Sequence, residues 1–219
     1  MAYLLVDVGS TFIKYGFYDE SSKTILSSDK YPFPEGKIDN EKRFSVPLTQ
    51  INEKILDIFA QAKEKGCSKA FICVQMHGFV LRNTDGSFGD YISWRDNSGD
   101  TTGAKIKEIN FNLMGTSLKS NLPLAKLAFR NLKGEFFTLG SYIAWLLTQN
   151  NVTHITDACA SGFFFSSTGE CNQYAGDLKM PTAYKQIKIV GVYNGISIYT
   201  PLGDHQTSFL GSGAQLDQY

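Results

Sequence analysis

The sequence lacks an excess of charge of either sign. Its 219 residues carry 21 basic and 21 acidic side chains, so the formal net charge at pH 7 is zero. Proteins that bind nucleic acids or anionic membranes through electrostatics carry a broad basic surface. We therefore expect neither of these partners, and any bound anion must be held by a local group of donors.

Cysteine is scarce, and long apolar runs are missing. The four cysteines show neither the paired spacing of a metal site nor the density of a disulfide scaffold. This usage favours a reducing compartment, so we expect a cytoplasmic protein. No apolar run reaches membrane-spanning length, and the first six residues lack the basic start of a secretion signal. We therefore predict no membrane span.

What the chain has is enough apolar residues for a sizeable core. Hydrophobic residues make up 42% of the sequence, and we expect one domain over residues 1–219. Strand-like runs come first and helical patterns follow, which predicts an α/β fold with a mixed central sheet flanked by helices.

The apolar spacing also predicts individual elements. Strands are expected at 4–8, 12–16 and 23–31, all antiparallel, followed by a helix over 47–65 that ends at Gly66. A buried strand at 70–74 should join the sheet in parallel through this helix. Further expected elements are helices at 101–109, 122–132, 139–149 and 207–213, and a hairpin over 187–199 that turns at 194–195.

The first candidate site is the turn near the N-terminus. Asp7 lies in an otherwise apolar strand, and Gly9, Ser10 and Thr11 form a turn before a strand that carries Lys14. Such a turn can aim backbone N–H groups and hydroxyls at an anion. A carboxylate in an apolar strand is costly unless it is paired, so Asp7 should face a metal, a water or a hydrogen-bonding cluster. An ordinary hairpin with Asp7 as a turn cap is the alternative.

Two more segments place polar residues after expected strands. Met76 and His77 follow the strand at 70–74, where α/β folds commonly place ligand-binding loops. Trp94 and Asp96 follow a short apolar run, and an aromatic ring beside a carboxylate can stack on a sugar and accept its hydroxyl hydrogen bonds. The alternatives are a structural histidine and a turn with an N-cap acid.

The last candidate segment contains Asp204, His205 and Gln206, at the start of the helix expected near the C-terminus. A helix N-terminus favours the ionised form of an acid, and such a carboxylate can accept a proton from an attacking hydroxyl. Helix capping would explain Asp204 equally well. The small residues at 156–162 are expected to allow close backbone packing.

Taken in order, these segments resemble the N-terminal half of the FGGY family of carbohydrate kinases, over nearly the whole chain. Asp-Val-Gly-Ser-Thr at 7–11 with Lys14 is similar to the family's first phosphate motif, and Gln-Met-His-Gly at 75–78 to its sugar-contact loop. Trp-Arg-Asp at 94–96 is similar to its Trp-x-Asp motif, and Gly-Asp-His-Gln at 203–206 to the segment that bears the catalytic base.

The resemblance implies a ribonuclease-H-like domain of the kind shared by actin and sugar kinases, with ATP and Mg²⁺ as cofactors. It implies that Asp204 is the general base that accepts the proton of a sugar hydroxyl, and that Asp7 and Asp204 position the magnesium. The residues implied beside the transferred phosphate are Gly9, Ser10, Thr11 and Lys14. The residues implied in sugar binding are Met76, His77, Trp94, Asp96, Asp204, His205 and Gln206.

The same resemblance bears on substrate choice. The Gln-Met-His-Gly loop resembles that of kinases for xylulose, sedoheptulose and related ketoses, whereas glycerol kinases typically have an Arg-Glu pair there. We therefore expect a ketose. Ser98 stands where the family often has an arginine, and His205 where an amide is common, so affinity or specificity is expected to differ.

Family members continue into a second domain that bears the adenosine site, whereas Tyr219 follows Asp204 closely. The resemblance therefore implies a missing C-terminal domain, in the same or another chain, and little kinase activity without it. Two alternatives remain open: one half of a split kinase, and a sugar-binding or regulatory module without catalysis. The chain could also pair with a second copy of itself.

Overall fold

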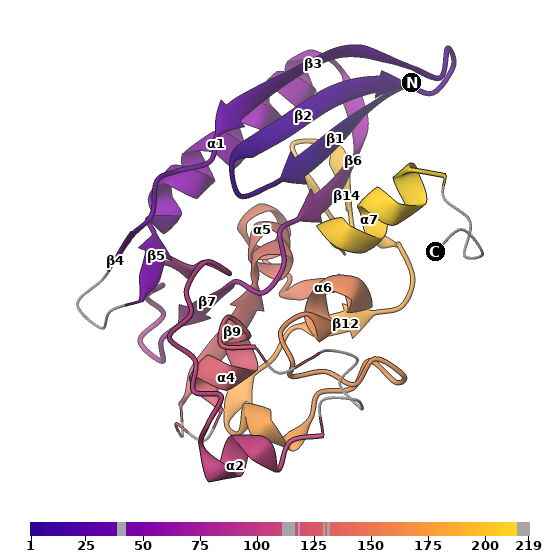
Figure 1. The fold of residues 1–219 in the computed structure, drawn as a ribbon. Coiled ribbons are helices and arrows are strands. Elements are labelled where there is room, and N and C mark those ends of the chain that lie inside the picture. The colour runs from indigo at the N-terminus through magenta and orange to yellow at the C-terminus, as the bar shows by residue number, and fades with distance from the viewer. Residues whose placement is uncertain (39–42, 111–116, 118, 129, 131, 214–219) are drawn as a thin grey trace.

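The larger of the two main sheets forms one layer of the molecule (Figure 1). The computed structural model describes residues 1–38, 43–110, 117, 119–128, 130 and 132–213. Within these residues the larger sheet has seven strands, in the order β13-β14-β6-β1-β2-β3, with β15 also paired to β6. The strands are β1 (Ala2–Val8), β2 (Phe12–Asp19), β3 (Thr24–Pro32), β6 (Cys67–Val74), β13 (Ile189–Tyr193), β14 (Ile196–Tyr199) and β15 (Leu202–Gly203).

The pairing of these strands follows the expected topology. β1, β2 and β3 are antiparallel, and β6 joins β1 in parallel after helix α1 (Leu48–Glu64). The expected crossover is therefore confirmed. α1 forms because its apolar residues recur every three or four positions and bury one face. It ends where expected, because Gly66 adopts a φ of 69°, which glycine tolerates best.

A second sheet lies below the first in Figure 1 and was not expected from the sequence. Its order is β11-β9-β7-β8-β5-β4, from β4 (Lys37–Ile38), β5 (Phe44–Val46), β7 (Phe79–Arg82), β8 (Tyr91–Ile92), β9 (Gly134–Thr138) and β11 (Leu178–Lys179). Strands of two to five residues are too short to show an alternating pattern. Helix α5 (Leu139–Thr148), expected at 139–149, contacts strands of both sheets.

The remaining elements are short. They are α2 (Ala104–Lys107), α4 (Pro123–Leu127), the pair β10 (Val152–His154) and β12 (Thr182–Tyr184), α6 (Ile155–Cys159), the 3₁₀ helix η1 (Gln173–Ala175) and α7 (Asp204–Gly211). The helices expected at 101–109 and 122–132 are wrong in length, although positions 129 and 131 lie outside the described residues. Pro123 starts α4 as a proline can, and Ala128 leaves the helical conformation.

The hairpin expected over 187–199 is confirmed as β13 and β14, and both turn residues, Asn194 and Gly195, have positive φ. The helix expected at 207–213 starts earlier, at Asp204.

The larger sheet has two different faces, because side chains alternate along a strand. Even-numbered residues of β1 pack with α1 and α5 in the main core. On the opposite face, Leu5, Asp7, Phe71 and Cys73 line an open, largely apolar hollow of about 690 Å³. Among the described helices, none is long and apolar enough to cross a lipid bilayer.

We expect α1 to stabilise the domain through its buried face. Ile55→Ala should lower the free energy of unfolding by about 2–5 kcal/mol, because the fully buried side chain leaves a cavity. Its neighbour Leu56 is 37% exposed, so Leu56→Ala is the matched control and should change stability by about 1 kcal/mol or less. Urea denaturation of both variants checks this, and equal losses would contradict the packing described.

Candidate functional site

The register of three parallel strands places two carboxylates at one edge of the larger sheet. Asp7 of β1 lies beside Cys73 of β6, and Cys73 lies beside Leu202 of β15. Asp204 follows β15 directly, so it emerges at the carboxyl end of the strands, where α/β folds place ligands. Asp7 and Asp204 are close enough for the charge of Asp7 to contribute to raising the pKa of Asp204.

Asp7 sits in a hydrogen-bonding cluster, which is one of the three surroundings that the sequence left open. Its Oδ2 pairs with Lys14 Nζ at 3.1 Å, and Cys73 Sγ donates to its Oδ1 at 3.6 Å. Burial, with the nearby charge of Asp7, raises the pKa of Cys73 to about 12, so the thiol keeps the proton that it donates. Asp7 therefore has paired oxygens within the sheet.

The Gly-Ser-Thr turn is braced from inside the chain. Gly9 N–H donates to Phe12 O at 3.1 Å, so this N–H does not point at an anion as the sequence suggested. Gln75 holds the turn against the end of β6, because its N–H donates to Val8 O and its Nε2 to Gly9 O. Within the part of the chain that the structure describes, the hydroxyls of Ser10 and Thr11 have no partner. The hydroxyls of Ser10 and Thr11 therefore remain as donors at this turn, whereas the N–H of Gly9 does not.

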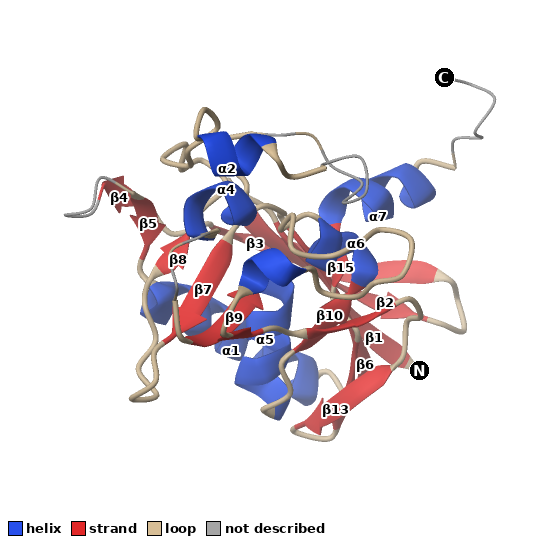
Figure 2. Ribbon diagram, turned by 90° about the horizontal axis from the view of Figure 1, so that it is seen from below, coloured by secondary structure: helices blue, strands red, loops and turns tan. Residues whose placement is uncertain are grey.

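Four of the residues expected to bind sugar line one cavity of about 340 Å³: Met76, His77, His205 and Gln206. The other walls come from α6 and the segment that follows it, chiefly Thr156, Cys159 and Ala160. Figure 2 shows α6, β15 and α7 gathered on one side of the molecule. The fold thus brings together loops that are more than 120 positions apart in the sequence.

His77 is fixed in this cavity by its backbone and its ring. Its φ of 65° lies in the left-handed region, which bends the chain sharply after β6. Nδ1 lies 2.7 Å from Ala160 O, and since a carbonyl can only accept, Nδ1 carries the proton. Burial lowers the pKa of His77, which favours the neutral ring. Nε2 is then a hydrogen-bond acceptor.

Asp204 is the first residue of α7, and Gly203 is the N-cap, so Asp204 does not cap the helix with its side chain. Burial raises the pKa of Asp204, and the backbone N–H of His205 opposes the rise only in part. A Cβ at Gly203 would lie 2.6 Å from Met76 Sδ, so glycine is what allows Met76 to pack against this segment.

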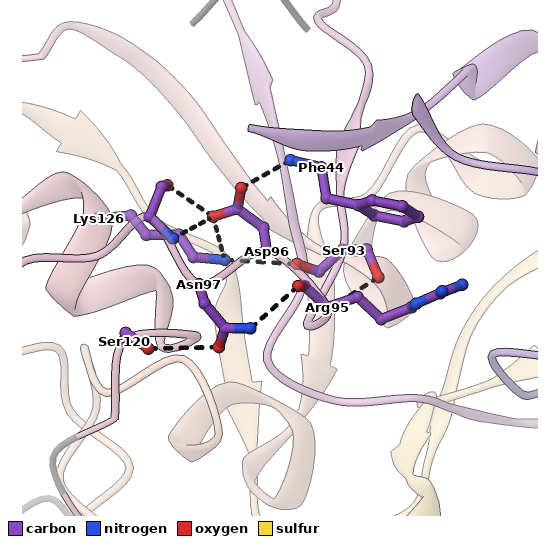
Figure 3. A network of polar contacts seen from close by, with 8 residues as sticks. Phe44, Ser93, Arg95, Asp96, Asn97, Ser120 and Lys126 are labelled. Atoms are coloured by element: carbon purple, nitrogen blue, oxygen red, sulfur yellow. Dashed lines mark hydrogen bonds and ion pairs between the residues drawn. The ribbon is translucent and has the colours of Figure 1, made fainter. Parts of the chain in front are cut away.

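Asp96 is placed differently from the sequence expectation (Figure 3). Its carboxylate is 2% exposed and forms an ion pair of 3.2 Å with Lys126, which is 3% exposed. Ser98 donates to Oδ1, and Phe44 N–H donates to Oδ2 at 2.7 Å. Although burial alone would raise the pKa of Asp96, the hydrogen bonds from Ser98 and Phe44 and the charge of Lys126 hold it below its usual value.

Both oxygens of Asp96 are therefore occupied inside the protein, and Asp96 lines neither cavity described above. What it organises is the loop that carries Trp94, whose side chain is 39% exposed. Its partner Lys126 was missed from the sequence, although a lysine inside the apolar stretch 122–127 was a signal of a buried cation.

Among the described residues, no group of three or more His, Cys, Asp or Glu side chains could hold a metal ion by itself. Mg²⁺ commonly binds one or two carboxylates and completes its shell with phosphates and water. Asp7 and Asp204 fit that kind of site, and the structure offers them at the same strand edge.

No protein-family model matches the sequence, and no curated protein matches it. Solved structures do match. Ligand-bound xylulose kinase from Lactobacillus acidophilus has a TM-score of 0.82 at 19% identity, over 97% of this chain and 50% of that chain. Gluconate kinase from the same organism gives 0.84 at 18%, over 98% and 50%. Plasmodium falciparum glycerol kinase with ADP gives 0.74 at 16%, over 97% and 50%.

These structures are sugar kinases of the actin and ribonuclease-H-like ATPase fold, and the expected α/β fold is confirmed. The resemblance to carbohydrate kinases drawn from the sequence motifs is likewise confirmed at the level of the fold. The chain spans about half the length of each of the three kinases that it matches.

The buried ion pair gives a test of this loop. Lys126→Met should lower the free energy of unfolding by about 3–5 kcal/mol, because it leaves the Asp96 carboxylate buried without its cation. The matched control is Lys179→Met, which removes a lysine that is 76% exposed and pairs with Glu135, and should cost about 1 kcal/mol or less. Chemical denaturation measures both, and a small loss in Lys126→Met would refute the pairing.

Proposed function

We propose that this chain is the sugar-binding and base-bearing half of an ATP-dependent carbohydrate kinase. The observation that carries the proposal is the meeting of Asp7 and Asp204 at one strand edge, next to a cavity lined by Met76, His77, His205 and Gln206. A volume of about 340 Å³ is within the range of small-molecule sites. The match to half of several sugar kinases supports the same assignment.

In this proposal Asp204 is the general base. Its carboxylate accepts the proton of the sugar hydroxyl as that oxygen attacks the terminal phosphate of ATP. Because burial raises its pKa, the ionised Asp204 carboxylate is a stronger base than that of an exposed aspartate. The neutral His77 ring accepts a hydrogen bond from a second sugar hydroxyl through Nε2, which orients the reacting one.

The phosphate side of the proposal uses the N-terminal turn. The hydroxyls of Ser10 and Thr11, the backbone near Gly9 and the ammonium of Lys14 lie beside the transferred phosphate. Asp7 and Asp204 would hold Mg²⁺, which neutralises charge on the phosphates when it is bound with ATP. The similarity to a glycerol kinase solved with ADP supports a nucleotide as the second substrate.

We further propose a ketose as the sugar, on the strength of the Gln-Met-His-Gly loop and the similarity to xylulose kinases. Trp94 contacts the sugar from the loop that the Asp96–Lys126 ion pair holds in place. Asp96 therefore affects sugar binding indirectly, through the position of that loop. The adenosine site belongs to a further domain, in the same or another chain, and the protein works in the cytoplasm.

Sugar binding can be measured on the chain directly by titration calorimetry with D-xylulose. Asp204→Ala and Gln206→Ala should each weaken binding about tenfold or more, because each removes a hydrogen-bond partner of the sugar. The matched controls are Asp85→Ala and Gln50→Ala. Both residues are exposed, and both changes should leave the affinity for D-xylulose unchanged. Absence of binding by D-xylulose and by other ketoses would refute the assigned site.

Phosphoryl transfer needs both substrates aligned in a site that excludes water. We therefore expect the 219-residue chain alone to release little ADP from ATP, with or without a ketose. A coupled assay of ADP release checks this. Robust turnover that Asp204→Ala abolishes would refute the need for a second domain while supporting the assigned base.

A further inference from the structure

Asp157 is a buried acid that the proposed reaction does not use. It lies on α6 and is 2% exposed, and it lines neither cavity at the strand edge. Its Oδ2 accepts hydrogen bonds from Thr138 Oγ1 at 2.5 Å and from Thr153 Oγ1 at 2.7 Å. A buried carboxylate is costly, and these donors only partly offset the cost, because burial still raises the pKa of Asp157 to about 6.

On one side Asp157 is attached to the start of α5. Thr138 is the N-cap of α5, and its Oγ1 accepts from Ser141 N–H at 3.0 Å while it donates to Asp157. Gly140, in the first turn of the helix, packs so closely that a Cβ there would lie 2.6 Å from Asp157 Oδ2. The carboxylate is therefore fixed to a helix that contacts both sheets.

Residues that neighbour Asp157 in the sequence form hydrogen bonds with the segment that precedes Asp204. Thr153 Oγ1 lies 3.2 Å from Pro201 O, and His154 N–H donates to the same carbonyl at 2.9 Å. Gly203 N–H donates to Thr156 Oγ1 at 3.0 Å. His154 and Thr156 thus hold both ends of the three-residue segment 201–203, while the one hydroxyl hydrogen of Thr153 goes to Asp157.

The position of α7 depends on the segment 201–203, because α7 itself is poorly packed against the rest of the domain. Among its described residues none is buried, and β15 before it is only two residues long. The orientation of Asp204 at the first position of α7 is therefore set mainly by the backbone in front of it.

We propose that Asp157 is a positioning residue for Asp204. Through Thr153 and Thr138 it fixes β10 and α6 to the start of α5, and His154 and Thr156 of these elements hold residues 201–203. Asp157 does not touch the sugar. The inference rests on the proposed function in one respect, since positioning of Asp204 affects sugar affinity only if Asp204 contacts the sugar.

The experiment compares Thr153→Val with Thr153→Ser in the whole chain. Thr153 is fully buried, so neither change touches bound sugar. Valine keeps the shape but removes the hydroxyl, while serine keeps the hydroxyl. Amide hydrogen exchange at Gly203 and His154 reports on the segment, amides of α1 report on global stability, and calorimetry with D-xylulose reports on the site.

In Thr153→Val, exchange at Gly203 and His154 should be about tenfold faster while α1 amides change little, and the affinity for D-xylulose should fall about tenfold. Thr153→Ser should restore both. Asp157→Ala should reproduce the valine phenotype, and if it does not fold, the valine and serine pair decides the matter.

The outcomes separate the two proposals. If the valine variant is folded and its Gly203 exchange stays within about twofold of the parent, the positioning role is refuted, whatever the sugar does. An increase spread evenly over α1 and Gly203 also refutes it, because it indicates a purely structural loss. If the parent chain binds no ketose, the proposed function fails, and the exchange data alone decide the role of Asp157.

Discussion

The parallel pairing of β6 with β1 on one side and β15 on the other is the constraint on which the candidate site depends. Parallel strands end at the same edge, so the register that aligns Asp7, Cys73 and Leu202 also fixes where Asp204 emerges. The crossover helix α1 makes this pairing possible, because its buried face covers β1 and β6 together. The cavity beside Asp204 follows from the same edge, since Met76 and His77 continue from the end of β6.

The elements that carry this edge were predictable because each repeats its pattern over enough residues. β1, β2, α1 and β6 each span at least seven positions, over which periodicity can be counted. The second sheet was not predictable, because β4, β8 and β11 each have two residues and are defined by their partners. The apolar pattern also overstated the length of α4, which ends at Leu127 where Ala128 leaves the helical conformation.

The site was predictable in its residue types and less so in their roles. Met76, His77, His205 and Gln206 were expected together, and the fold places them in one cavity. Asp96 was expected at the surface of the site, yet it is buried in an ion pair with Lys126, thirty positions later in the sequence. A sequence shows that a charge exists, but the cation that pays its desolvation cost is known only once the chain has folded. The upward shift in the pKa of Asp204 has the same origin, since burial outweighs the helix N-terminus.

The carboxylates of this chain therefore divide by what surrounds them. Asp96 pairs with a buried lysine and becomes part of the scaffold. Asp157 is held by two hydroxyls and the backbone of Gly140, and burial still raises its pKa. Asp7 and Asp204 remain partly exposed at one edge, where the charge of Asp7 contributes to raising the pKa of Asp204. In the proposed site a bound cation would offset this effect of Asp7 on Asp204, whereas Asp96 already has the ammonium of Lys126. The strand register thus keeps Asp7 and Asp204 at one edge, where the proposed Mg²⁺ would be held.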